Sequence, residues 1–403
     1  MVKQALLEPS ESTKPSELTL SRAVTRTGSS AIRDLLHVTE LPHVTSLAGG
    51  LPNPRTFPIA EIEEAVTDAL ADDPTAALQY GPTEGHRSLR SWIAHRMQLD
   101  DDQLDQVVVT TGAQQALDLL ARALLDPGDA IALADPAYVG AIQAFRSADA
   151  NLVAIPADGD GMQVDALAEQ LADGLRLKAV YIVANFDNPT GATLSADRRG
   201  DLAALADRYG FWIIDDDPYG ELRWAGTAPI GLRHLSDHVI TVGSTSKVLC
   251  PGLRIGWVVG PPRVSRAITG LKQSADLHTS SLSQQVAVRV LERPGFLPDH
   301  LATLRATYRV QAESLAGALD RHLGDRATFQ TPQGGMFIWV ELAGRSIDTT
   351  ELLPCAVGHG VAYVPGRAFS VADPHAARMR LSFATCTPDE LDDAVGRLAV
   401  ALA

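Results

Sequence analysis

The chain has 403 residues, 45% of them hydrophobic, and a formal net charge of −15 at pH 7. This length exceeds that of one ordinary hydrophobic core, so we expect one large domain and one smaller domain. The acidic balance argues against nucleic acid or an anionic membrane surface as a partner, although a small anion can still bind in a local basic pocket.

The residue spacing supports neither a metal site nor a secreted protein. The three cysteines lie far apart without a C-x-x-C pair, and the 11 histidines include no zinc-ligand spacing, so we expect no disulfide framework and no metal. No apolar run has the length of a signal-peptide core or of a membrane span. We therefore expect a soluble, cytoplasmic protein.

From about residue 105 the chain alternates between short β-branched runs and amphipathic helical stretches, beginning with "QVVVT" and "AQQALDLLARALL". This alternation predicts an α/β fold with a mostly parallel sheet. Past residue 295 the pattern changes to one long helix, about residues 298–323, and two later strands, "GGMFIWVEL" and "RMRLSFAT". The expected division is an N-terminal arm and segment that packs on the small domain (1–57), a large domain (58–294) and a small C-terminal domain (295–403).

In such sheets, ligands gather where loops leave the carboxyl ends of strands. The first of these loops follows "QVVVT" and reads "TGAQQALDLL". Gly112 permits a tight turn, and the free backbone N–H groups of a helix that begins near Ala113 would face a bound anion. An ordinary strand-to-helix turn is the alternative, because this motif is weak by itself.

Two further strand ends carry polar residues. Asn188 lies in the string "NPTG", which fits both a ligand contact and a simple turn rich in Pro and Gly. The segment "FWIIDDDPYGEL" leaves an apolar strand with three consecutive acids, and Tyr219 follows three residues after the middle one, Asp216. Solvation of a strand end is the alternative explanation for these acids.

Lys247 lies in "GSTSKVLCPGLRIGW", just after an apolar run, and Arg254 follows seven positions later. A lysine at the end of a buried strand is costly unless it is neutralised, paired or used, because desolvation disfavours the ammonium form. Lys247 is therefore a candidate for chemistry.

Taken together and in this order, the segments resemble the pyridoxal-phosphate enzymes of fold type I. With "LQYGPTEGHRSLR", "SLAGGLPNPRTFP" and "RLSFA", the resemblance narrows to the class I/II aminotransferases, in the branch of the 2-aminoadipate and kynurenine aminotransferases. It extends from about Ser30 to the C-terminus. It implies a mostly parallel seven-stranded sheet flanked by helices, a smaller α+β C-terminal domain, and pyridoxal 5'-phosphate as the cofactor.

The resemblance implies a role for each matching residue around the cofactor. Lys247 resembles the lysine that forms the internal aldimine and shuttles the proton. Asp216 matches the acid that pairs with the pyridine nitrogen, and Tyr219 matches a hydrogen-bond donor to the phenolic oxygen of the ring. The other residues that match cofactor-binding positions are Gly112, Ala113, Gln114, Tyr138, Asn188, Ser244, Ser246 and Arg254.

The resemblance also implies contacts with the substrate. Arg380 in "RMRLSFA" corresponds to the arginine that grips the substrate α-carboxylate through a bidentate fork. Arg378, two positions away on the same strand face, is a competing choice. Gly50 and Asn188 match further substrate contacts. Arg33 matches an N-terminal segment that closes over the substrate side chain, with a surface helix as the alternative.

Tyr80 matches a residue that reaches the phosphate of the neighbouring subunit, so the resemblance implies a homodimer with shared active sites. The implied activity is transfer of an amino group between an L-amino acid and a 2-oxo acid through a Lys247 aldimine, and 2-oxoglutarate is the expected acceptor. An enzyme of the same fold that diverts the quinonoid to decarboxylation-coupled deamination, elimination or oxidation is an alternative. A transcription regulator with an aminotransferase-like domain is another, but only about 40 residues precede "SLAGG", fewer than a DNA-binding domain needs.

Overall fold

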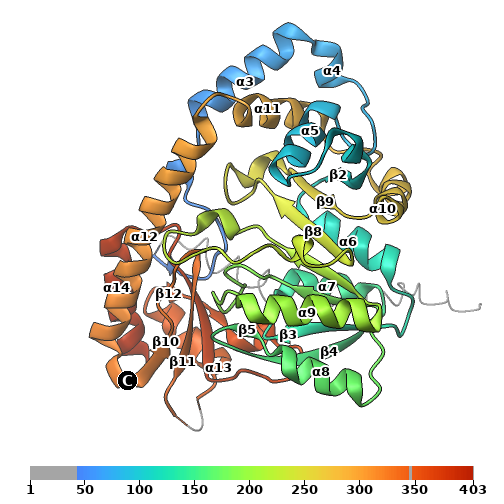
Figure 1. Cartoon of the computed structure of the whole chain (residues 1–403). Coiled ribbons are helices and arrows are strands. Elements are labelled where there is room, and N and C mark those ends of the chain that lie inside the picture. The colour runs from blue at the N-terminus through green and yellow to red at the C-terminus, as the bar shows by residue number, and fades with distance from the viewer. Residues whose placement is uncertain (1–42, 345–346, 403) are drawn as a thin grey trace, which may run out of the picture.

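The computed structural model describes residues 43–344 and 347–402. Its largest element is an eight-stranded sheet with the strand order β2-β9-β8-β7-β6-β3-β4-β5 (Figure 1). The strands of this large sheet are β2 (Val107–Thr110), β3 (Ala130–Asp135), β4 (Asn151–Asp158), β5 (Gly161–Met162), β6 (Ala179–Ile182), β7 (Trp212–Asp216), β8 (Val239–Ser244) and β9 (Gly256–Val259).

Most neighbouring strands of the large sheet are parallel. The run β4-β3-β6-β7-β8 is parallel throughout, whereas β9 lies antiparallel between β8 and β2. The two-residue strand β5 adds an antiparallel edge to β4. The expected mostly parallel sheet of seven strands is therefore confirmed, and this short edge strand is an addition to it.

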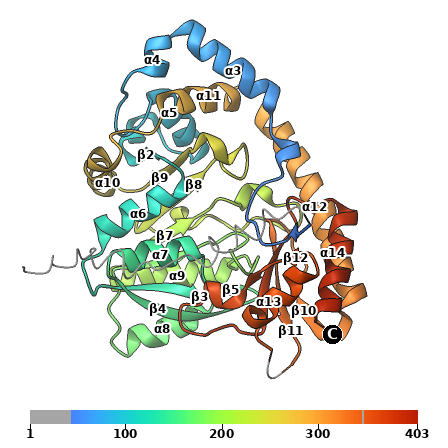
Figure 2. The same cartoon turned by 180° about the vertical axis from the view of Figure 1, so that it is seen from behind.

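Helices cover both faces of the large sheet (Figures 1 and 2): on one face α6 (Ala113–Leu124) and α7 (Val139–Ser147), on the other α8 (Val164–Ala172) and α9 (Ala196–Tyr209). The side chains of Ile131 and Leu133 join the apolar core that includes α6 and α7. Ala132, between them, joins the core that includes α8 and α9. A strand that is apolar on both faces reads as a continuous hydrophobic run, which is why these strands show no alternation of polar residues in the sequence.

A second, small sheet has four antiparallel strands in the order β10-β11-β14-β13. Its strands are β10 (Ala327–Phe329), β11 (Phe337–Leu342), β13 (Val364–Pro365) and β14 (Arg378–Ser382). The expected long helix is confirmed as α12 (Phe296–His322), which lies side by side with α14 (Pro388–Ala401) in both views. The division of the chain into domains at residue 295 stays a prediction.

The remaining helices pack at the ends of the two sheets. They are α3 (Ile59–Asp72), α4 (Pro74–Leu78), α5 (Arg87–Arg96), α10 (Pro262–Ala275) and α11 (Ser281–Leu291) toward the β2 edge, and α13 (Thr349–Gly358) beside the small sheet. Within the described ranges, no helix combines the length and the apolar character needed to cross a membrane. The same ranges contain no group of three or more His, Cys, Asp or Glu side chains placed to hold a metal ion.

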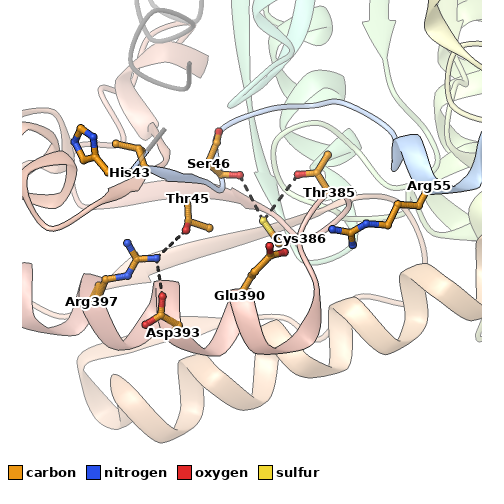
Figure 3. Close-up of a pocket in the computed structure, with 10 residues that line it drawn as sticks. His43, Thr45, Ser46, Arg55, Thr385, Cys386, Glu390, Asp393 and Arg397 are labelled. Carbon is orange, nitrogen blue, oxygen red and sulfur yellow. Dashed lines mark hydrogen bonds and ion pairs between the residues drawn. The ribbon is translucent and has the colours of Figure 1, made fainter. Parts of the chain in front are cut away.

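The first strand of the described chain, β1 (Thr45–Ser46), pairs in parallel with β12 (Val361–Ala362). This pairing holds the N-terminal part of the described chain beside the small sheet. Arg397 on α14 donates to Thr45 Oγ1 at 2.7 Å, next to a hollow of about 580 Å³ (Figure 3). The carbonyl oxygen of Leu47 accepts a hydrogen bond of 2.7 Å from the β14 backbone. These contacts place the residues that follow β1 against the cavity described next.

Candidate active site

A cavity of about 300 Å³ lies where loops leave the carboxyl ends of the parallel strands. Its walls come from the segment after β1, the N-terminus of α6, the loops after β3, β6, β7 and β8, and strand β14. The residues predicted from the sequence that line this cavity are Gly50, Ala113, Gln114, Tyr138, Asn188, Asp216, Tyr219, Ser244, Ser246, Lys247, Arg254 and Arg380.

Three other predicted residues are placed differently. Gly112 is the N-cap of α6 with φ of +79°, and a Cβ atom there would overlap the Arg254 guanidinium, so only glycine lets that side chain come so close. Tyr80 is 78% exposed outside the cavity, with its ring edge-on to the ring of His278 at 5.7 Å. Arg33 lies outside the described residues.

One end of the cavity is built to bind an anion. The N-terminus of α6 leaves backbone N–H groups free, and Ser244, Ser246 and Arg254 lie around it. The Ser244 and Ser246 hydroxyl oxygens are 2.8 Å apart, and Arg254 has a φ of +55° and donates to the Thr111 carbonyl at 3.2 Å. Hydroxyls, a guanidinium and helix N–H groups together are typical of a phosphate site.

Lys247 Nζ lies in the same cavity and donates to the Gly50 carbonyl at 2.6 Å. The pKa of Lys247 is lowered to about 8, mainly by burial and also by the cations Arg380 and Arg254, while Asp216 opposes the shift. The shift increases the neutral fraction of the amine near neutral pH, and only the neutral amine is a nucleophile or a base.

Asp216 ends strand β7 and is only 3% exposed. Its Oδ2 accepts a hydrogen bond of 2.9 Å from the Tyr181 hydroxyl, whereas its buried Oδ1 has no partner among the described residues. Burial raises the pKa of Asp216 to about 7, against the opposing effect of the Tyr181 hydrogen bond. A buried carboxylate oxygen without a donor fits a site that receives an N–H group from a ligand.

Tyr181, the hydrogen-bond donor to Asp216, was not among the residues predicted from the sequence. It lies on β6, next to β7 in the sheet, and is 2% exposed. A tyrosine in an otherwise aliphatic buried strand needs a hydrogen-bond partner for its hydroxyl. The tyrosine in this apolar run was therefore the sequence feature that could have indicated a polar contact here. The apolar lining residues Leu51, Val183, Pro218 and Pro251 were also missed, because residues of these types carry no pattern that separates a cavity wall from a core.

Arg380 is buried at 2% exposure and is held by groups from three parts of the chain. It donates to Asn188 Oδ1 at 2.7 Å and to the Ala48 carbonyl at 2.6 Å, and its guanidinium carbon lies 4.2 Å from the ring centre of Phe337. Burial lowers the pKa of Arg380 to about 10, yet the side chain stays cationic near neutral pH. Asn188 in turn donates to the Tyr219 hydroxyl at 3.5 Å.

Arg378 shares a strand face with Arg380 but does not line the cavity. It lies opposite Glu341 in the sheet and donates to the carboxylate of that residue at 3.2 Å. Of the two arginines that the sequence left in competition, the structure therefore places Arg380 at the cavity and Arg378 in an ion pair.

Comparison with known proteins adds independent findings. Residues 45–398 match the family described as aminotransferase class I and II. The chain is 40% identical over 380 residues to aromatic-amino-acid aminotransferase 1 of Thermococcus litoralis, an alignment that covers 92% of this chain and 90% of that protein.

Two solved structures superpose on the chain with a TM-score of 0.89. The multiple substrate aminotransferase of Thermococcus profundus is 39% identical, with 95% of this chain and 96% of that chain covered. LysN, the α-aminoadipate aminotransferase of Thermus thermophilus, complexed with N-(5'-phosphopyridoxyl)-L-leucine, is 36% identical, with 95% of this chain and 97% of that chain covered.

Replacement of Asp216 by Asn is expected to stabilise the ligand-free protein more at pH 8 than at pH 5. The pKa of this carboxyl is about 7 in the folded chain and near 3.8 without burial, so between these values the folded state binds more protons than the unfolded state. Wild-type stability should therefore fall as pH rises through that window, and a neutral amide escapes the penalty.

Melting temperatures of both proteins at the two pH values measure the effect. Asp201→Asn, on the exposed face of α9, is the control and should change the melting temperature equally at both. If Asp216→Asn and the wild type differ in melting temperature by the same amount at pH 5 and at pH 8, burial does not raise the pKa of Asp216 and the prediction is wrong.

Proposed function

Because this chain belongs to the class I and class II aminotransferases, whose cofactor is pyridoxal phosphate, we propose that it moves an amino group between an L-amino acid and a 2-oxo acid, with 2-oxoglutarate as the acceptor. One observation carries the proposal: Lys247, Asp216 and Arg380 meet in a single cavity. They supply an amine of lowered pKa, an acid with a free oxygen and a buried cation. Amino transfer uses the amine and the acid, and the cation selects substrates with a carboxylate.

The cavity also fits the cofactor. The buried Asp216 Oδ1, which lacks a donor among the described residues, suits the ring N–H of pyridoxal phosphate. Ser244, Ser246, Arg254 and the N-terminus of α6 would hold the phosphate, where hydroxyl, guanidinium and backbone N–H donors converge. The tight packing between Gly112 and Arg254 supports this assignment, because a larger residue there would push the guanidinium away.

When bound, pyridoxal phosphate supplies an aldehyde that condenses with amines and a protonated ring that takes up electron density from the substrate α-carbon. Asp216 would keep the ring nitrogen protonated, and Tyr181 would hold its other oxygen and so orient the carboxylate. Tyr219 and Asn188 would donate to the phenolic oxygen of the ring, and Tyr138 would stack on the ring face.

Lys247 Nζ would hold the cofactor covalently in the resting enzyme. Its amine, once free, would act as the base that takes the α-proton of the substrate and then as the acid that donates a proton to complete the transfer. The lowered pKa suits both tasks, because a general base or acid is most effective when its pKa lies near the operating pH.

Arg380 would bind the α-carboxylate of the substrate. Its hydrogen bonds to Asn188 and Ala48 fix the plane of the guanidinium, so the fork is oriented before the substrate arrives. The neighbouring Gly50 brings backbone close to the same place.

A homodimer with shared active sites is part of the proposal. Leu78, Tyr80 and Leu277 expose 69%, 78% and 39% of their surface, and the Tyr80 ring touches His278, next to Leu277. Large exposed apolar side chains grouped in this way mark interaction surfaces. Tyr80 would reach the phosphate site of the partner subunit. The cytoplasmic location stays a prediction.

A panel of acidic, aromatic and branched amino donors with 2-oxoglutarate tests the function. Transfer requires that one glutamate forms for each donor consumed. If the donor is consumed without glutamate and ammonia, carbon dioxide or hydrogen peroxide is released, the result favours the alternative. In that alternative the same cofactor serves decarboxylation-coupled deamination, elimination or oxidation.

Replacement of Lys247 by Ala is expected to leave a folded protein that binds pyridoxal phosphate without a covalent link. Amino transfer should fall by about three orders of magnitude or more, because one side chain provides both the attachment and the proton transfer. Borohydride reduction followed by peptide mass spectrometry measures the link. Lys178→Ala, at a half-exposed lysine, is the control and should retain the label on Lys247. Recovery of the label on any other lysine of the wild-type protein would contradict the assignment.

Replacement of Arg380 by Ala is expected to abolish the preference for an amino acid over the matching amine that lacks the carboxylate. The loss of a buried bidentate partner should cost about 2–5 kcal/mol in substrate binding, and Arg380→Lys should not recover it. Half-reaction rates with the two substrates measure the preference. Arg378→Ala is the matched control, because it removes an arginine from the same strand face and should keep the preference; the reverse pattern would exchange the two roles.

A further inference from the structure

A buried carboxylate–imidazole pair lies outside the residues assigned so far. Asp135 ends strand β3, and His375 lies in the loop before β14. The exposed fractions are 8% and 5%, and His375 Nε2 lies 2.8 Å from Asp135 Oδ1. The backbone N–H groups of residues 371–373 also donate to this carboxylate at 2.8–3.0 Å. All these donors therefore come from one loop, which joins the small sheet to the end of a central strand.

The hydrogen bonds determine the tautomer of His375. Its Nδ1 lies 3.2 Å from Nη1 of Arg378, and a guanidinium group only donates. Nδ1 is therefore the acceptor, and Nε2 carries the proton that it donates to Asp135. Burial alone would raise the pKa of Asp135, but the hydrogen bonds from His375 and the three backbone amides lower it, so the carboxylate stays ionised.

The loop held by Asp135 reaches two sides of the cavity. The backbone N–H of Ala137, two residues after Asp135, donates to the Phe369 carbonyl at 2.9 Å. The next residue, Tyr138, lines the cavity, and the Phe369 ring centre lies 5.0 Å from the Arg380 guanidinium carbon. The Asp135 side chain and the Ala137 amide thus tie the loop that covers Arg380 to the turn that carries Tyr138.

At the seam between this loop and the turn that carries Tyr138, Phe369 belongs to a small apolar cluster whose buried residues are Ala48, Val139, Ala362, Val364 and Phe369. The ring of Trp339 packs on this cluster and lies edge-on to the rings of both Phe369 and His375. Apolar contacts are non-directional and permit sliding, whereas hydrogen bonds to one buried carboxylate fix distance and angle. The polar bonds of Asp135 are therefore the part of this seam that can set its geometry.

We propose that Asp135 and His375 form a positioning clasp that sets Arg380 relative to the Tyr138 side of the cavity and thereby sets the preference of the site for ligands with an α-carboxylate. The inference rests on the proposed function, in which Tyr138 stacks on the cofactor and Arg380 binds the carboxylate. Asp135 and His375 act through Ala137 and Phe369 and are positioning residues.

The test compares two small ligands of the holoenzyme. 2-Methylalanine has no α-proton, so it binds without the transfer reaction, and tert-butylamine, which has a methyl group in place of the carboxylate, lacks the α-proton as well. Calorimetric titration measures both dissociation constants. The wild type should bind the acid more tightly, and His375→Leu should reduce this ratio about tenfold, the effect of one weakened charge-assisted hydrogen bond.

Conservative variants separate positioning from general stability. His375→Gln, whose amide N–H takes the place of Nε2–H, should restore the ratio to within about threefold of the wild type. His375→Asn, polar but shorter, should not restore it, and serves if His375→Leu fails to fold. His238→Leu is the matched control, because it breaks another His–Asp pair, with Asp207 at 3.1 Å, far from the cavity.

Hydrogen exchange gives a readout that needs no ligand. The amides of Val371, Ala372 and Asp373 should be protected in the holoenzyme and should exchange at least about tenfold faster in His375→Leu, because the carboxylate they share loses its fourth donor. Unchanged exchange together with an unchanged acid-to-amine ratio in folded His375→Leu would overturn the clasp. A wild type without any preference for the acid would instead overturn the role proposed for Arg380, while the exchange experiment would still test the clasp.

Discussion

Arg380 is a positive charge held out of water by parts of the chain that are far apart in sequence, and the geometry of the cavity depends on this burial. It donates to the Asn188 side chain beside the large sheet and to the Ala48 carbonyl after β1, and it lies over the rings of Phe337 and Phe369. A buried ion costs several kcal/mol unless its hydrogen bonds are made. The small sheet, the segment after β1 and the loop after β6 must therefore be in place together for the cavity to exist.

The same cation shapes the chemistry around it. Among the described charged side chains that line the cavity, Lys247, Arg254 and Arg380 are basic and Asp216 is acidic, so this part of the cavity is locally positive in a chain whose net charge is −15. A local positive field in a low-dielectric cavity attracts small anions whatever the overall charge. Burial is the main cause of the lowered pKa of Lys247, and this positive field adds to the shift, whereas Asp216 opposes it. Burial and one arrangement of charges together produce the reactive amine and the anion sites.

The strands and the main site residues were predictable because each lies in a local pattern. The alternation of apolar runs and amphipathic stretches follows from a sheet buried on both faces, and Lys247, Asp216 and Asn188 each stand just after such a run. Tyr181 was not predictable as a partner of Asp216, because the two are 35 residues apart and meet only through the pairing of β6 with β7. Asp135 and His375 are 240 residues apart and meet only in the folded chain.

Hydrophobic periodicity predicted the fold class and the long helix α12, and short motifs indicated the cofactor through their resemblance to a known family, because both kinds of pattern are encoded between near neighbours in the chain. The choice between Arg378 and Arg380 was decided only by the tertiary structure. The two side chains share a strand face and a residue type, so no local pattern separates them. Arg378 donates to Glu341, an exposed carboxylate on the neighbouring strand. Arg380 is enclosed by Asn188, Ala48 and two aromatic rings. What surrounds a side chain depends on which distant segments fold against it, and that information is absent from its sequence neighbours.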